Sequence, residues 1–180
     1  MKPMRRKDSR SGHEERKEFE QVILDLARVT RVTEGGKHMS FRACLIIGDR
    51  AGRVGFGVAK GKDVQLAMEK SGKQARKNII RVPIVKGTIP HLVIAKFKAA
   101  KVLLKPAPVG SGIIAGGAVR VVLDLAGIPN VSSKILSKTK NKIAVVKATF
   151  EALKSFKNTG SSKPKEVQIV AEIGEAGDNK

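Results

Sequence analysis

Hydrophobic and polar residues alternate along three separate stretches in the first half of the chain. The stretches cover residues 19–32, 40–47 and 54–58, and a period of two residues is typical of half-buried β-strands. Turn sequences separate them, with Glu34-Gly35-Gly36-Lys37 after the first stretch and Asp49-Arg50-Ala51-Gly52 after the second. Strands joined by such short turns pair antiparallel. The pattern therefore predicts a three-stranded antiparallel sheet.

A helix is predicted after the third strand, over about residues 64–80, with Asp63 as its N-cap. The stripe expected to pack on the sheet consists of Val64, Met68, Ala75 and Ile79. The small residues Ser71 and Gly72 would allow helix and sheet to approach closely. Residues 19–84 are thus predicted to form a small first domain, which should lean on a neighbour.

The second half of the chain is predicted to form another domain, over residues 86–157, in the order β-β-α-β-α. Its elements are a hairpin over residues 92–97 and 102–104, a helix from the glycine-rich segment 110–117 to residue 126, a strand over residues 131–136 and a final helix that Asn141 caps. Gly127 and Pro129 should end the first of these helices. The strand-helix-strand step requires a parallel strand pair, which by default crosses over right-handedly. The predicted class is α+β, with the second domain a two-layer sandwich.

Both ends of the chain lack such periodicity. Residues 1–18 are polar and rich in Lys and Arg, which predicts a flexible basic arm, and residues 158–180 are predicted to be a polar tail. No apolar run approaches the ~20 residues that a membrane-spanning helix needs. The charged N-terminus does not resemble a secretory signal. We therefore expect a cytoplasmic protein with no membrane partner.

Positive charge dominates the sequence and changes this picture. Lys and Arg number 36 against 16 Asp and Glu, a formal net charge of +20. Between Lys70 and Phe150 the 16 basic residues face a single acidic one, Asp124. A folded surface with so few neutralising partners is better explained by a polyanion than by solvation alone. Because the chain has six Phe but no Trp or Tyr, recognition of RNA shape and phosphates is favoured over base stacking.

Residues for catalysis, metal binding or a cofactor are not grouped in the sequence. His13, His38 and His91 lie in three different segments, so no metal ligand set is expected. Cys44 alternates within an apolar strand, which predicts an inert buried thiol and no internal disulfide. The acids of the folded part are scattered, and no pair suggests acid-base chemistry. The sequence thus favours a protein that is not an enzyme and has no cofactor.

Two glycine patterns offer other interpretations. Gly110-x-Gly112-x-x-x-Gly116 approaches a dinucleotide fingerprint, but prolines interrupt the preceding strand and no acid follows at the ribose position. Residues 53–58 approach the RNA-contacting strand of an RNA-recognition motif, which needs at least two stacking aromatics, whereas Phe56 is alone here. Neither pattern therefore displaces the phosphate-binding hypothesis.

Three motifs in this order resemble the family of bacterial small-subunit ribosomal protein five. They are Arg28-Val29-Thr30-Arg31 with Gly35-Gly36-Lys37, then Gly52-Arg53-Val54-Gly55-Phe56-Gly57, and Gly112-Ile113-Ile114-Ala115-Gly116-Gly117-Ala118-Val119-Arg120. The resemblance covers residues 19–156. It implies a first domain similar to a double-stranded-RNA-binding fold without its first helix. It also implies a left-handed β-α-β step in the second domain, in place of the right-handed default.

The resemblance further implies a role and partners. A family member would be a structural constituent of the small ribosomal subunit that binds its ribosomal RNA, braces the head against the body and contributes to translational accuracy. The loop 30–37 would reach ribosomal RNA near the spectinomycin pocket. Ribosomal proteins four and eight would be neighbours, and messenger RNA would pass close by at the entry channel.

Candidate site residues follow from charge, from glycine and from this resemblance. The RNA-binding set is Arg28, Thr30, Arg31, Gly35, Gly36, Lys37, Arg42, Arg53, Lys70, Lys73, Arg76 and Lys77. The set implied for the contact with ribosomal protein four is Gly110, Gly112, Gly116, Gly117 and Arg120.

Two other classes of function remain open at this point. An enzyme is one, because the second-domain fold also serves ATPases and kinases, and absence of ATP turnover would argue against it. A free-standing duplex-RNA-binding module is the other, and comigration with small subunits would separate it from a ribosomal protein.

Overall fold

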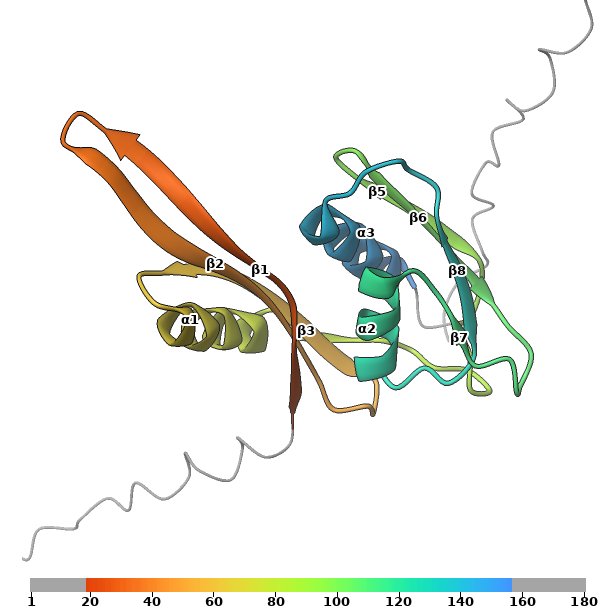
Figure 1. Ribbon diagram of the computed structural model, residues 1–180. Helices are drawn as coiled ribbons and strands as arrows, with labels where there is room; N and C mark the ends of the chain where they lie inside the picture. Colours follow the sequence, from red (N-terminus) through yellow and green to blue (C-terminus); the bar gives the residue numbers. More distant parts are fainter. Residues whose placement is uncertain (1–18, 157–180) are drawn as a thin grey trace, which may run out of the picture.

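A computed structural model describes residues 19–156 and shows two four-stranded sheets with three helices (Figure 1). The first half contains β1 (Glu20–Thr33), β2 (Gly36–Gly48), β3 (Arg53–Gly61), α1 (Val64–Lys77) and β4 (Ile80–Arg81). The second half contains β5 (Val93–Phe97), β6 (Ala100–Pro106), β7 (Ile113–Ile114), α2 (Gly117–Leu125), β8 (Val131–Ile135) and α3 (Lys142–Ser155). The predicted α+β class is confirmed. The arm 1–18 and the tail beyond residue 156 lie outside the described residues.

The first sheet is antiparallel, in the order β1-β2-β3-β4, and has one strand more than predicted. The predicted helix end at Ile80 is wrong by three residues, since α1 ends at Lys77. The helix ends there because the residues that follow pair with the edge of β3 as strand β4. Ile80 lies opposite Val54, and the N–H of Val82 donates to the carbonyl of Gly52 at 2.8 Å. Asp63 does cap the helix, accepting from the N–H of Val64 at 2.7 Å.

Small residues bring α1 onto the sheet, and Ala75 is the only member of the predicted stripe that is buried. The buried positions of α1 are Ala67, Ser71 and Ala75, whereas Val64, Met68 and Ile79 are only half-buried. The buried residues Ala67, Ser71 and Ala75 face glycines of β3. A β-carbon on Gly57 would overlap the carbonyl oxygen of Ser71, and one on Gly61 would come within 2.6 Å of the Ala67 nitrogen. The helix therefore lies almost in backbone contact with the strand, at the distance that glycine permits.

The second sheet has the order β5-β6-β8-β7, and its pairing corrects the predicted topology. The hairpin strand β6 pairs with β8 antiparallel, and the parallel pair is the short β7 with β8. The chain reverses between β6 and β7. Gly110 and Gly112 take positive φ there, +95° and +68°, and both donate their N–H groups to the side-chain oxygen of the buried Asn130, at 2.9 and 3.3 Å. This reversal makes the strand-helix-strand step β7-α2-β8.

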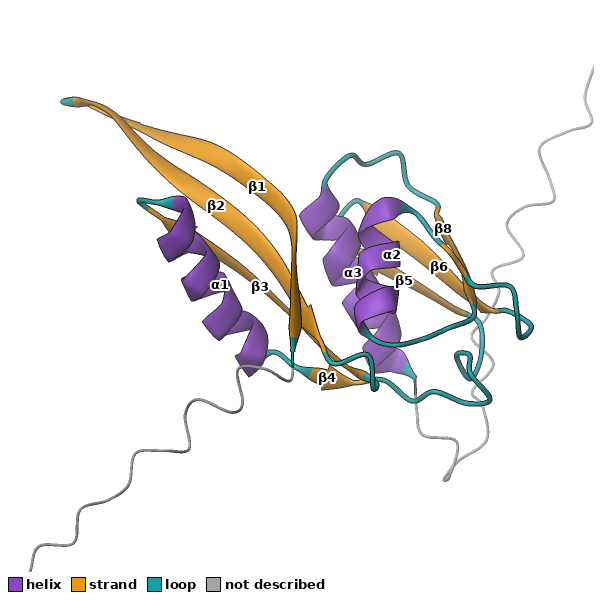
Figure 2. Ribbon diagram, turned by 60° about the horizontal axis from the view of Figure 1, so that its bottom comes forward, coloured by secondary structure: helices purple, strands orange, loops and turns teal. Residues whose placement is uncertain are grey.

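Helices α2 and α3 lie between the two sheets, so the halves share one core (Figure 2). Ile46 and Val54 of the first sheet belong to the same buried cluster as Val119 of α2 and Phe150 of α3. The rings of Phe56 and Phe150 lie 4.5 Å apart. Residues 43–48 are all buried, because α1 covers one face of β2 and the second half covers the other. The limits 19–84 and 86–157 stay predictions, since the core does not divide there.

The turn between β2 and β3 joins the C-terminus of α2 through the backbone. The N–H groups of Arg50 and Gly52 donate to the carbonyls of Leu125 and Ala126, at 3.1 and 3.0 Å. These carbonyls belong to the helix end, where carbonyls lack partners within the helix. Gly127 ends the helix with φ +74°, as predicted. We refer to residues 49–52 and 125–127 as the joint.

Candidate nucleic-acid interface

The hairpin of β1 and β2 projects beyond the rest of the first sheet (Figure 1). Strand β3 pairs with β2 only from Phe41 onward, so residues 36–40 contact β1 alone within the sheet. A two-residue turn, Glu34 and Gly35, closes the hairpin, and Gly36 has φ +129°. A β-carbon on Gly35 would meet no atom within 4 Å. The turn therefore leaves free space beside Gly35 and Gly36 for a partner.

The predicted hairpin residues are exposed, but the pairing register divides them between two faces. One face is the side of the sheet that carries α1. It includes Arg28, Thr30 and Lys37, because the register places them on the same side as Leu45 and Ile47, which pack against that helix. Arg31 lies on the opposite face, across from His38. Arg31 and Lys37 thus lie on the projecting part of the hairpin, one on each face, while Arg28 lies at its base, opposite Phe41.

The exposed side of α1 continues the first of these faces. Lys70, Lys73, Arg76 and Lys77 are all exposed, and none of the ion pairs in residues 19–156 involves them. Arg76 and Lys77 lie in the last helical turn, where positive charge is favourable to the helix dipole. The four cations therefore lie on the exposed side of α1 outside any of these ion pairs, and Glu69 is the one acidic residue of this helix.

Arg42 and Arg53 differ from the other candidates because carboxylates of the chain hold them. Arg42 lies 3.5 Å from Asp25. Arg53 pairs with Asp49 and lies over the ring of Phe19, 5.0 Å from its centroid. Burial would raise the pKa of Asp49, but hydrogen bonds from the Arg53 side chain and from two backbone N–H groups hold that pKa below its ordinary value. A phosphate contact by either arginine stays a prediction and would compete with these pairs.

The residues implied for a protein interface lie in the reversal before β7 and in the first turn of α2. Gly116 is its N-cap and Gly117 its first residue, while Gly110 and Gly112 lie in the preceding reversal. Arg120 is exposed, one turn into the helix. The five positions thus extend along β8, from Asn130, which Gly110 and Gly112 contact, to Ile135, which lies against Gly116. Their contact with another protein stays a prediction.

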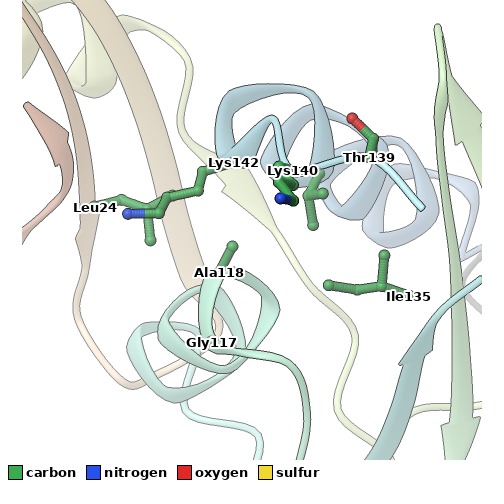
Figure 3. A pocket seen from close by; sticks show the side chains of 8 residues that line it. Leu24, Gly117, Ala118, Ile135, Thr139, Lys140 and Lys142 are labelled. Atoms are coloured by element: carbon green, nitrogen blue, oxygen red, sulfur yellow. The ribbon is translucent and has the colours of Figure 1, made fainter. Parts of the chain in front are cut away.

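A pocket of about 370 Å³ lies between the two halves, and sequence reasoning missed it (Figure 3). Leu24, Ala118, Ile135 and Val145 give it an apolar lining, to which Lys140 and Lys142 add two cations. Its residues come from β1, α2, β8, the start of α3 and the loop between β8 and α3, so only the tertiary arrangement creates it. Residues 19–156 contain no cluster of three or more His, Cys, Asp or Glu able to hold a metal. None of the helices in these residues is long and apolar enough to cross a membrane.

Cys44 is predicted to be unreactive in the folded protein. Its side chain is buried between the halves, and burial, followed by the charge of Asp25, raises the pKa of the thiol from 9.0 to about 11. The nucleophilic thiolate is therefore scarce at neutral pH. An aromatic disulfide reagent at pH 8 should label Cys44 only after denaturant is added. Labelling of the native protein at the rate of a free thiol would contradict the assignment.

Between about pH 9 and 11 the unfolded chain loses the proton of the Cys44 thiol before the folded chain does, so stability should fall as pH rises through that window.

Comparisons with known proteins show two family models and several relatives that match this chain. The model of the ribosomal protein S5 N-terminal domain matches residues 19–83, and that of the ribosomal protein S5 C-terminal domain matches residues 95–164. Small ribosomal subunit protein uS5 of Thermotoga neapolitana is 48% identical over 139 residues, which are 77% of this chain and 78% of the relative. The protein of the same name from Mycoplasma mobile is 49% identical over 142 residues, 78% of this chain and 58% of the relative.

Proposed function

The chain belongs to the ribosomal protein S5 family, and from this premise we propose that it binds small-subunit ribosomal RNA through the β1–β2 hairpin and the cations of α1. The family has a structural role in the small ribosomal subunit, in the cytoplasm, and is not a family of enzymes. The observation that carries the proposal is the projecting hairpin, whose Arg31 and Lys37 are exposed near an open glycine turn, with Arg28 exposed at its base. Exposed cations on a narrow projection can reach phosphates that a flat surface cannot.

The shared core supports a bracing role for the same protein. Because α2 and α3 fill the space between the sheets, the hairpin and the start of α2 belong to one continuous packed unit. We propose that RNA segments of head and body are held at these two places, with ribosomal proteins four and eight as neighbours and messenger RNA near the entry channel. A contribution to translational accuracy would then arise at Gly110, Gly112, Gly116, Gly117 and Arg120.

Neutralising the hairpin cations tests the RNA contact. We expect the triple variant Arg28→Gln, Arg31→Gln and Lys37→Gln to bind small-subunit ribosomal RNA roughly tenfold more weakly. Its slope of log affinity against log salt should fall by about 2, since each lost phosphate contact removes about 0.7–0.9. Filter binding of the full chain over a salt series provides the measurement. The control is Lys62→Gln, Lys86→Gln and Lys154→Gln, three exposed lysines outside the candidate set. Equal losses in both triples would reject the hairpin assignment.

Sedimentation separates this proposal from a free-standing duplex-RNA-binding module. Tagged protein in a cell extract should comigrate with small subunits at low and at high salt. Release to the top of the gradient at modest salt would favour the free module. ATP turnover by the pure protein, abolished by a substitution in the second half, would favour an enzyme instead.

A further inference from the structure

The second sheet has an outer face that no helix or strand of the described residues covers. Helices α2 and α3 pack on its inner side, toward the first sheet (Figures 1 and 2). The pairing register fixes which residues point outward. Buried Val93, Val102 and Leu104 define the inner side, so their alternates along each strand lie on the outer one. This outer face consists of Ile94, Lys96, Lys101, Leu103, Lys105, Ile114, Ser132 and Lys134.

Charge on the outer face has a single sign. Lys96, Lys101, Lys105 and Lys134 are all exposed, and β5 to β8 contain no Asp or Glu. Lys96 lies directly opposite Lys101, an arrangement in which like charges repel and destabilise a strand pair. None of the four takes part in an ion pair within residues 19–156. An external anion would relieve this repulsion.

The dimensions of the patch suit several phosphates. Lys101 and Lys105 are four residues apart on one strand, about 13 Å. The four lysines span three adjacent strands, about 10 Å across. We propose that the outer face of the second sheet is an additional binding surface for the sugar-phosphate backbone of ribosomal RNA, separate from the hairpin and α1. This inference rests on the proposed function, since it assigns a new contact to the same ligand.

The chemistry of the face favours RNA backbone over a protein partner. Protein interfaces are depleted in lysine, whereas lysine serves as a point charge for phosphate. The face has no aromatic side chain to stack on bases. Ile94 and Ile114, 47% and 58% exposed, lie on the two edge strands of this face and can contact sugars once phosphates hold the RNA strand. Recognition here would thus follow backbone shape rather than sequence.

The test compares two full-length quadruple variants that lose the same charge. One carries Lys96→Gln, Lys101→Gln, Lys105→Gln and Lys134→Gln. The control carries Lys62→Gln, Arg81→Gln, Lys86→Gln and Lys154→Gln, which are exposed positions outside every proposed surface. The probe is a transcript of small-subunit ribosomal RNA, bound over a salt series. We expect the sheet variant to lose roughly tenfold to a hundredfold in affinity at ~0.15 M salt and about 3 from the salt slope, more than the control loses.

Three results would overturn or separate the proposals. Equal losses in the two quadruple variants would mean that the lysines are only solvated. Unchanged RNA binding together with lost comigration with small subunits would mean that the face binds a protein. If the unaltered chain fails to bind the transcript, the proposed function itself is wrong. Thermal unfolding distinguishes misfolding from lost contact, because removing the Lys96–Lys101 repulsion should leave the melting temperature unchanged or raise it.

Discussion

Replacing Gly57 with alanine should destabilise the protein by about 3 kcal/mol or more, although it adds one methyl group. That methyl would overlap the carbonyl oxygen of Ser71 and lie 2.7 Å from the Ala75 nitrogen. Both atoms belong to the backbone of α1, so no rotamer change relieves the clash and the helix must move off β3. Overpacking of a tight core costs about 1–3 kcal/mol, and rigid backbone neighbours place this site at the upper end. The melting temperature should fall by roughly 6–12 °C.

Gly72→Ala is the matched control on the opposite side of the same contact. Its new methyl would come no closer than 3.6 Å to the side chain of Leu45, an ordinary van der Waals distance. Alanine is favoured over glycine within a helix by about 1 kcal/mol, so this variant should be slightly more stable. Thermal or urea unfolding of both variants tests the pair. A Gly57→Ala protein as stable as the unaltered chain would show that α1 does not lie this close to β3.

A second large effect is expected at the joint, from Gly127→Ala. Gly127 has φ +74°, and a methyl there would overlap the backbone of Arg50, 2.9 Å from its Cα atom. The left-handed conformation costs a non-glycine residue roughly 1–2 kcal/mol, and separating the turn from α2 adds a similar amount or more. The hydrogen bonds from Arg50 and Gly52 to the helix end should be lost. We expect a total destabilisation of about 3–4 kcal/mol.

Gly112→Ala is the matched control, because it has the backbone strain without the clash. Gly112 has nearly the same φ, +68°, but a methyl there meets no atom within 4 Å. It should therefore lose only the roughly 1–2 kcal/mol of the left-handed conformation. Chemical denaturation gives both values. Equal losses in the two variants would mean that contact with Arg50 contributes nothing and that the halves are not fastened at residues 125–127.

The local features of the fold were predictable because short-range patterns determine them. The alternation over residues 19–58 predicted β1, β2 and β3, and Asp63 and Asn141 predicted the helix caps, which the N–H groups of Val64 and Ala144 confirm. The pairing of β6 with β8 was not predictable in this way. It depends on the reversal at Gly110 and Gly112, and a glycine-rich stretch alone does not say in which direction the chain leaves it.

The packing of α1 on the sheet was likewise not predictable from a local pattern. Its apolar stripe was chosen from the helix alone, whereas the glycines of β3 decide that Ala67 and Ser71 are the contact positions. The candidate site was predicted as a set of exposed cations, but not how β1 divides them between two faces. The outer face of the second sheet was overlooked. The signal that could have identified it is the alternation in β6, where Lys101, Leu103 and Lys105 are separated by the buried Val102 and Leu104.

The single core that spans both sheets has a consequence for synthesis of the chain. When Lys77 at the end of α1 has been translated, the first sheet is complete except for β4, but Ile46, Val54 and Phe56 still lack the helices that cover them. The last covering residue is Phe156. At a translation rate of about 5–20 residues per second, the gap lasts on the order of 4 to 16 s. During that interval the nascent protein presents an uncovered apolar sheet face, so its exposure to aggregation depends on how fast α2 and α3 follow.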